Sequence, residues 1–237
     1  MYIFRVVETF AAAPLNVMSG INDMELVERG GKLMLYTATR GGGGVMALEV
    51  GSAITLSDQE MLSPGLTLPA PARLEILSVA GAPRLVVTGA NTAGVQTFGL
   101  EPAGTLAAPV QMPGGLSGAV SAQAVVQIGG STFLYLARAG ESTIHAFAVS
   151  ATGSLTPAGS RVLDGPHPGV DIASLASVTV GGQTFLISLS LEADAIRSFP
   201  LGPGGAIGQP QAIGAPQGLG LSDPSAIQVV EMAGSSF

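Results

Sequence analysis

Two aspartates of this chain stand at matching places and could hold a metal ion together. Asp171 and Asp223 each precede a glycine-containing turn by ten residues. Carboxylates that come side by side offer the oxygen ligands that a hard cation such as Ca²⁺ prefers. The alternative is that each aspartate caps a turn by accepting backbone N–H groups, a common role of Asp at the end of a loop. Asp171 and Asp223 are therefore candidate metal ligands with a structural alternative.

A histidine in a proline-rich segment is the second feature that could do chemistry. His167 lies in the sequence GPHPG, with Asp164 and Asp171 nearby. A histidine beside carboxylates can act as a general base or bind a metal, whereas one histidine alone makes a poor metal site. The candidate catalytic set consists of His167, Asp171 and Arg138. The loop of Arg138 also carries Glu141. The alternatives are an exposed loop histidine and a solvated ion pair.

Several catalytic and binding motifs are absent from the sequence. Residues 41–44 are four glycines, but no Gly-Lys-Ser/Thr follows, so they do not form a phosphate-binding loop. No G-x-S-x-G nucleophile motif, H-E-x-x-H zinc motif or EF-hand loop is present. The chain has no cysteine, which excludes a disulfide scaffold and a cysteine-ligated zinc site.

The charge and hydropathy of the chain exclude two further classes of partner. Nine basic and sixteen acidic residues give a net charge of −7, and Lys32 is the single lysine, so nucleic acid is a poor partner. Residues 102–137 and 172–191 carry no charge, but Pro109, Pro113 and several glycines interrupt the first stretch, and Gly181-Gly182 interrupts the second, where Ser and Thr alternate with apolar residues. They predict buried β-structure rather than membrane spans. Residues 1–14 lack the long apolar core of a secretory signal.

An internal repeat organises the segments that carry these residues. Nine-residue strings begin at turns: GGKLMLYTA at Gly30, GAPRLVVTG at Gly81, GGSTFLYLA at Gly129 and GGQTFLISL at Gly181. Their spacings are 51, 48 and 52 residues, and AGSSF at Ala233 begins a fifth string 52 residues later. Each full repeat has a second anchor, a β-branched residue followed three positions later by Phe or Leu. The β-branched residue lies 14 or 15 residues after the start of the turn. Two anchors that stay in step indicate a true repeat.

Each repeat predicts four short antiparallel strands. In the fourth repeat, residues 173–180 and 184–189 alternate in polarity on either side of Gly181-Gly182, which suits a two-residue hairpin. Residues 196–201 and 207–213 supply a third strand and a weaker fourth one. No segment shows a sustained helical stripe, so we expect very little helix. Such units are typical of β-propeller blades, whereas a β-sandwich needs no repeat and a solenoid repeats at shorter spacing.

The sequence predicts one all-β propeller domain that is part of a larger ring. The blades are expected at residues 23–71, 72–120, 121–170 and 171–222, with a closing strand and loop at 1–22 and the start of a fifth blade at 223–237. Phe237 falls midway through a hairpin, which would leave an open sheet edge. We expect an N-terminal fragment of about four and a half blades from a seven-bladed ring. The alternative is a complete four- or five-bladed ring closed by its end strands.

In a propeller, ligands bind where loops meet near the axis. The connections between blades and the loops between second and third strands would face that side. Besides the candidates above, these loops carry further polar residues: Asp23, Arg40, Asn91, Glu192 and Asp194. If the candidate residues point into one axial pocket, an enzymatic function is favoured. If they scatter as turn caps, a binding or architectural function is favoured.

The segment FLYLARAGESTIHAFAVSATGSLTPAGS, residues 133–160, resembles the blade consensus of the lactonase-type, seven-bladed β-propeller family. In that family an LYVA-type strand leads to a polar loop, an I-x-x-F pair and a Gly-x-Leu turn. The V-x-x-V-G-G-x-x-F-L hairpins are similar to the N-terminal propeller regions of secreted bacterial proteins with hemolysin-type calcium-binding repeats. The calcium-binding nonapeptide is absent, so the resemblance implies that any Ca²⁺ is bound beyond residue 237. No lactonase catalytic set matches residue by residue.

Two function classes follow. The first is a non-catalytic binding or architectural module of a secreted bacterial calcium-binding-repeat protein. Its partners would be the remaining blades of the same chain and a protein or carbohydrate ligand at the loop face. The second is a lactonase-like hydrolase with a polar site at the propeller axis. The lack of a catalytic motif favours the first class, and no cofactor is evident in the sequence.

Overall fold

The computed structural model describes residues 20–39, 44–61, 73–91, 94–114, 118–163, 172–190 and 195–214, with short pieces at 226–227, 229, 231–232 and 235–236. Within these residues the chain is all-β, and its one helical segment is a single 3₁₀ turn, η1 (Pro203–Gly205). None of the described segments is a helix long and apolar enough to cross a bilayer. The prediction of an all-β chain with very little helix is confirmed.

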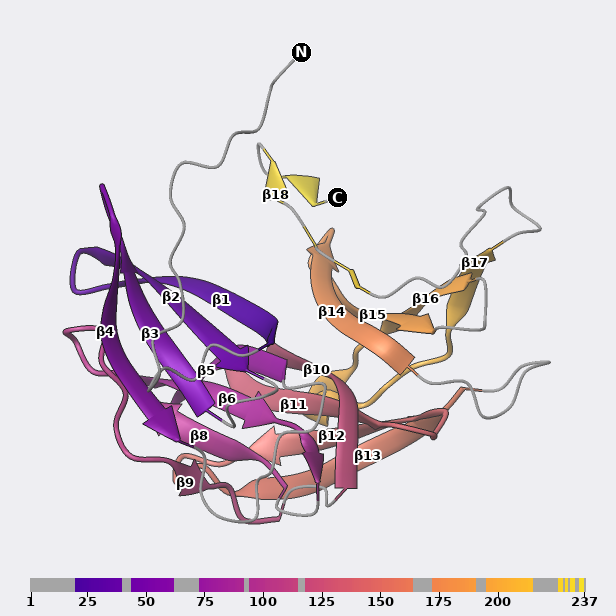
Figure 1. Ribbon diagram of the computed structural model, residues 1–237. Coiled ribbons are helices and arrows are strands. Elements are labelled where there is room, and N and C mark those ends of the chain that lie inside the picture. The colour runs from indigo at the N-terminus through magenta and orange to yellow at the C-terminus, as the bar shows by residue number, and fades with distance from the viewer. Residues whose placement is uncertain are drawn as a thin grey trace.

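Four antiparallel sheets, called blades 1 to 4, follow one another along the chain and fan around a common centre (Figure 1). Blade 1 consists of β1 (Ile21–Arg29), β2 (Lys32–Thr39), β3 (Gly44–Val50) and β4 (Ile54–Met61). Blade 2 consists of β5 (Arg73–Val79), β6 (Ala82–Thr88), β8 (Gln96–Gly99) and β9 (Val110–Gln111).

Blade 3 consists of β10 (Gly118–Ile128), β11 (Ser131–Arg138), β12 (Thr143–Val149) and β13 (Leu155–Val162). Blade 4 consists of β14 (Ile172–Val180), β15 (Gln183–Ser190), β16 (Ala195–Pro200) and β17 (Gln211–Gly214). The short β7 (Ala90–Asn91) pairs with β10 and ties blade 2 to blade 3. A last hairpin joins β18 (Glu231–Met232) and β19 (Ser235–Ser236). These sheets confirm the predicted β-propeller blades.

The blade boundaries and the number of blades stay predictions. The expected closing strand, at residues 2–10, lies outside the described residues. The hairpin of β18 and β19 stands where a fifth blade is expected to begin, and β19 lies next to β14 of blade 4.

Two-residue turns join the first and second strands of every blade. Three of these turns pair glycines with positive φ: Gly30-Gly31, Gly129-Gly130 and Gly181-Gly182. In blade 2 the turn is Ala80-Gly81, and Ala80 has a φ of 50°. Gly81 is therefore the second turn residue, and the sequence alignment placed this repeat one residue out of register. The alignment failed because an alanine fills a left-handed position, which L side chains rarely occupy.

The second sequence anchor marks one fixed position of the third strand. Its Leu or Phe lies opposite a leucine of the second strand in every blade: Leu48 opposite Leu35, Phe98 opposite Leu85, Phe147 opposite Leu134 and Phe199 opposite Leu186. In blades 2 to 4 these pairs lie on the face that the blade turns toward the preceding one, and they enter three clusters of buried side chains between blades. In blade 1, Leu48 and Leu35 belong instead to a small cluster within the blade itself. The repeat in the sequence thus reflects one packing contact made again and again.

Tyrosine hydroxyls reinforce two of these junctions. Tyr36 of β2 donates to the carbonyl of Gly104 at 2.9 Å, and Tyr135 of β11 donates to the carbonyl of Gly205 at 3.1 Å. Both hydroxyls are buried, so each needs a partner, and each finds it in the turn that follows the third strand of the next blade. Blades 1 and 2 are therefore joined by the same bond as blades 3 and 4.

Blade 1 carries an apolar row on its face away from blade 2. Leu26, Leu35, Leu48 and Leu56 stand opposite one another across its four strands. The equivalent face of blade 2, which includes Leu85 and Phe98, packs against blade 1. Leu26 and Leu56 are 57% and 37% exposed, whereas Leu48 is 3% exposed, so the first and fourth strands carry the exposed part of this row.

Candidate functional site

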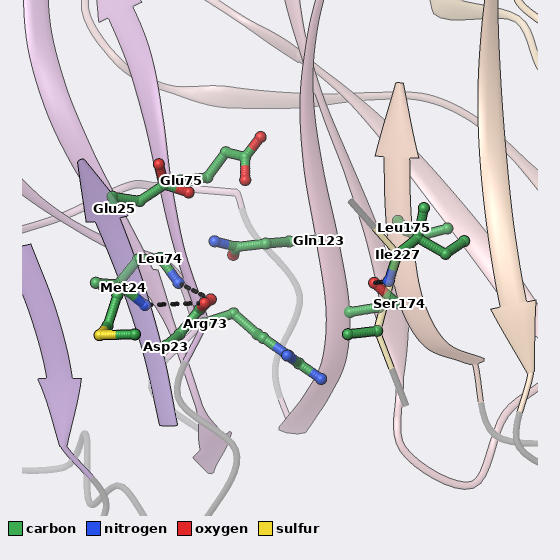
Figure 2. Close-up of a pocket in the computed structure, with 12 residues that line it drawn as sticks. Asp23, Met24, Glu25, Arg73, Leu74, Glu75, Gln123, Ser174, Leu175 and Ile227 are labelled. Carbon is green, nitrogen blue, oxygen red and sulfur yellow. Dashed lines mark hydrogen bonds between the residues drawn. The ribbon is translucent and has the colours of Figure 1, made fainter. Parts of the chain in front are cut away.

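A polar pocket of about 180 Å³ lies where the innermost strands of the blades meet. Its walls come from β1, β5, β10 and β14 and from the piece at 226–227, so five successive segments reach it. Figure 2 shows the charged and amide side chains of these strands gathered around one space. The polar residues of the wall are Asp23, Glu25, Arg73, Glu75, Gln123 and Ser174.

One strand position supplies much of this wall. Asp23, Arg73, Ala122 and Ser174 each lie seven residues before the first residue of their hairpin turn. In β1, β10 and β14 an irregularity in the strand pairing falls directly before this position. An extra residue in one strand increases the local twist and re-aims the next side chain. The bulge therefore turns the residue after it toward the axis.

Asp23 links blade 1 to blade 2. Its Oδ1 accepts the N–H of Met24 at 3.0 Å, and its Oδ2 accepts the N–H of Leu74 at 2.9 Å (Figure 2). Burial raises the pKa of Asp23, and these two backbone bonds and the nearby Arg73 oppose that rise. β5 is an edge strand of its sheet, so its outward N–H groups have no partner within the blade, and Asp23 supplies one.

The same device recurs around the axis. Glu75 Oε1 accepts the N–H of Val125 in blade 3 at 3.3 Å, and Ser174 Oγ accepts the N–H of Ile227 at 3.3 Å. The first bond joins the innermost strands of blades 2 and 3, and the second joins β14 to the piece at 226–227. These polar side chains add hydrogen bonds between neighbouring blades at the centre of the fan, beside the β7–β10 pairing that joins blades 2 and 3.

Arg73 spans more of the axis than any of these groups. Its Nε donates to the carbonyl of Ser121 in blade 3 at 3.1 Å, and its Nη2 donates to the carbonyl of Ala173 in blade 4 at 2.9 Å. Both acceptors stand at the bulges of their strands. A guanidinium, with five N–H groups on a rigid plane, suits such a bridge between three blades.

Two glutamates of the pocket titrate near neutral pH. Burial raises the pKa of Glu25 to about 7, and the charge of Asp23 adds to that rise. Burial raises the pKa of Glu75 to about 8, with further rises from the charges of Glu25 and Asp23 and an opposing effect of the Val125 N–H. At pH 7 each carboxyl is therefore available as a proton donor and as an acceptor.

Gln123 brings an unused donor into the pocket. Its side chain is only 5% exposed, and its Oε1 accepts the hydroxyl of Thr88 at 2.7 Å. Its Nε2 is buried and has no hydrogen-bond partner. Figure 2 shows the amide reaching from β10 toward the side of the pocket where Glu25 and Glu75 lie. A buried amide without a partner is costly, so a bound polar group would complete it.

Of the polar residues singled out from the sequence, Asp23 lines the pocket in the part of the chain that the structure describes. Arg138, at the end of β11, does not line the pocket and forms an ion pair with Glu141 at 2.8 Å. Glu141 also lies 3.5 Å from His145. His167, Asp171 and Asp223 lie outside the described residues, as do Arg40, Asp164, Glu192 and Asp194. Asn91 lies on β7. Asp23 was expected in a connection between blades and lies instead within β1.

Sequence reasoning missed Glu25, Arg73, Glu75 and Gln123. A signal was present, because Glu25 and Glu75 both stand five residues before the first residue of their turns once Ala80 is placed in the turn. The misplaced register at Gly81 hid this match. Among the described residues, no group of three or more His, Asp or Glu side chains is arranged to hold a metal ion.

Solved structures share this fold at low sequence identity. An exo-β-1,3-galactanase from Phanerochaete chrysosporium, solved with β-1,3-galactotriose, has a TM-score of 0.59 over 92% of this chain and 56% of its own, at 11% identity. An α-L-arabinofuranosidase from Clostridium thermocellum has a TM-score of 0.52 over 81% of this chain and 73% of its own, at 16% identity. Hydrazine synthase from Kuenenia stuttgartiensis has a TM-score of 0.54 over 89% of this chain and 53% of its own, at 11% identity.

At such identities these likenesses show the β-propeller fold alone. This chain spans about half the length of the first solved structures that it matches. Enzymes that act on carbohydrates and a hydrazine synthase share the fold, so the chemistry has to be argued from the site. No protein-family model and no curated protein sequence matches the chain.

Proposed function

We propose that the axial pocket binds a small, hydroxyl-rich ligand of about one sugar ring. The observation that carries this proposal is the set of unused hydrogen-bonding groups in the pocket. Gln123 Nε2 is a buried donor without a partner, and the carboxyl of Glu25 has no hydrogen bond or ion pair within the described residues. A ligand with adjacent hydroxyls can donate to a carboxylate and accept from an amide at the same time.

The volume and polarity of the pocket limit the ligand. A volume of about 180 Å³ is close to that of a cavity of about 150 Å³ that holds a benzene molecule, so one six-membered ring fits. Drug-sized ligands need pockets of roughly 300–1,000 Å³, which excludes a long chain bound within the pocket itself. The fold relatives that act on galactans and arabinofuranosides support a sugar as the class of ligand.

Isothermal titration calorimetry with a panel of monosaccharides at pH 7 tests this proposal. We expect binding of at least one sugar by the wild type, weakened about tenfold by Gln123→Leu, which removes the amide donor. Glu28→Gln, an exposed position on the same strand as Glu25, is the matched control and is expected to bind as the wild type does. Absence of binding to every sugar, or equal binding by Gln123→Leu, contradicts the proposal.

A second candidate function is acid–base hydrolysis at the same site. The specific observation that favours it is the pair of glutamates with pKa values of about 7 and about 8, because general acids and bases work best near the ambient pH. One glutamate would donate a proton to a leaving group while the other activates water. Aryl glycosides and small lactones are the substrates to assay, with Glu25→Gln and Glu75→Gln as variants. If both variants retain turnover, or if the wild type turns over none of these substrates, this candidate function is wrong.

The setting of the propeller remains a further proposal. The resemblance of residues 133–160 to lactonase-type blades, and of the hairpins to propellers that precede calcium-binding repeats, supports a secreted bacterial protein whose calcium sites follow residue 237. Sequencing the gene beyond this position tests it, and calcium nonapeptides there are the expected result. A reading frame that continues without such repeats contradicts it.

A further inference from the structure

The axial pocket holds more acidic groups than basic ones. Asp23, Glu25 and Glu75 face a single guanidinium, that of Arg73. Arg73 donates to two backbone carbonyls and forms no ion pair within the described residues. Buried carboxylates without a cation are costly, and their mutual repulsion adds to that cost. A positive charge placed among them would relieve both effects.

The free oxygen atoms lie on Glu25 and Glu75. Both oxygens of Asp23 already accept backbone N–H groups, and Glu75 Oε1 accepts the N–H of Val125. This leaves Glu75 Oε2 and the two oxygens of Glu25 for a ligand. Figure 2 shows these two carboxyl groups on the same side of the pocket.

An ammonium group fits this set of acceptors better than a metal ion does. No described group of three or more acidic or His side chains has an arrangement that could hold a metal. A primary ammonium carries three N–H donors and needs only hydrogen-bond distances, so two carboxyl groups from different strands can share it. Gln123 Nε2, buried and without a partner, is then placed to donate to a hydroxyl of the same ligand.

We infer that the axial pocket prefers a hydroxylated ligand with a protonated amino group, such as an amino sugar, held by Glu25 and Glu75. This inference rests on the proposed function and names the class of ligand more closely. An amino sugar supplies the ammonium for the carboxylates and hydroxyls for Gln123. It also has the size of one ring, as the pocket requires.

Binding of an ammonium ligand in this pocket is coupled to the protonation of Glu25 and Glu75. Both glutamates carry protons for part of the time at pH 7, and an ammonium binds their ionised forms. Binding of a cation at pH 7 therefore releases protons to the buffer, whereas binding of a neutral sugar does not require this release. The proton release is a property of the wild type and needs no variant.

The experiment is calorimetry at pH 7 with D-glucosamine, D-glucose and N-acetyl-D-glucosamine, in buffers of different ionisation enthalpy. We expect glucosamine to bind about tenfold more tightly than either neutral sugar and to release protons, since hydrogen bonds to charged groups are the stronger kind. Glu25→Gln should lose most of this preference, and Glu28→Gln should keep it. Thermal unfolding of both variants confirms that they are folded.

Each result distinguishes the inference from the proposed function. If neutral sugars bind and glucosamine binds no more tightly, the inference is wrong and the proposed function stands. If no sugar binds, with or without an amino group, both are wrong. If glucosamine binds without proton release and Glu25→Gln binds it as well as the wild type, the amino group lies elsewhere and the inference is wrong.

Discussion

Polar side chains at the propeller axis divide into two groups by what they already bond. Asp23 and Glu75 each accept a backbone N–H from the innermost strand of the next blade, and Ser174 accepts one from Ile227, so these side chains join successive segments around the axis. Glu25 and the amide nitrogen of Gln123 have no such role within the described residues. A site for a ligand is best sought among groups whose bonding is incomplete, because folding alone does not account for burying them.

The pKa values at the axis predict how stability depends on pH. The folded protein keeps a proton on Glu75 up to about pH 8, whereas an unfolded glutamate releases it near pH 4.5. Between these values the folded state binds more protons than the unfolded state, so the free energy of unfolding falls as pH rises. Glu25, with a pKa of about 7, contributes in the same direction.

Glu75→Gln should remove much of this pH dependence. The glutamine keeps an oxygen for the Val125 N–H and carries no charge. At pH 9 we expect the variant to be more stable than the wild type by about 1–3 kcal/mol, less than the whole shift implies because water can enter the site. Urea unfolding from pH 5 to pH 9 measures this, with the exposed Glu101→Gln as the control. A variant whose stability falls with pH as steeply as that of the wild type contradicts the assignment.

At the scale of strands and turns, the glycine-rich turns after the third strand lock neighbouring blades together. Gly104 and Gly205 have φ values of +87° and +79°, and their carbonyls accept the hydroxyls of Tyr36 and Tyr135. A Cβ on Gly104 would lie 2.6 Å from Met34 Sδ, and one on Gly205 would overlap with Cδ1 of the Phe133 ring. Small size, and not only backbone freedom, is required at these turns.

Gly205→Ala separates the two requirements when compared with Gly204→Ala. Gly204 has a similar φ of +70°, but a Cβ there meets nothing within 4 Å. We expect Gly204→Ala to cost about 1–2 kcal/mol of backbone strain. Gly205→Ala should cost about 1–3 kcal/mol more, because it also displaces the Phe133 ring. Chemical denaturation of both variants measures the difference, and equal costs would show that Phe133 moves aside freely.

For the whole molecule, the apolar row of blade 1 is a candidate packing surface. The row consists of Leu26, Leu35, Leu48 and Leu56 of blade 1. In blades 2 to 4, the equivalent face is packed against the preceding blade. The piece at 226–227 lines the axial pocket together with β1, and Ile227 bonds blade 4 as Leu74 bonds blade 1. We therefore propose that a further four-stranded blade of the same ring packs on this row.

Leu26→Asp tests whether the row is covered. If a blade packs there, the buried charge should lower the free energy of unfolding by about 2–3 kcal/mol. Val110→Asp is the matched control, because Val110 is 54% exposed against 57% for Leu26 and lies on the outer strand β9. That control should change the stability by less than about 0.5 kcal/mol. Equal small effects in urea unfolding would mean that the row faces solvent.

The sequence by itself determined the blades of this protein. Spaced turns, alternating strands and the recurring Leu or Phe of the third strand are local signals, and every blade repeats them. They predict four-stranded sheets because strand alternation and turn chemistry act over a few residues. The one error of register, at Ala80-Gly81, arose where an alanine takes the conformation expected of glycine.

Only the tertiary structure decided which polar residues share a site. Glu25, Glu75 and Gln123 come from three strands that are about fifty residues apart along the chain, by the spacing of a blade repeat. Bulges turn neighbouring side chains toward the axis. The packing of the blades against one another removes water from around Glu25 and Glu75, and this desolvation raises their pKa values. Sequence reasoning favoured polar loops such as that of Arg138, because a charged residue within a strand gives no sign of where its side chain will point until the sheets are packed.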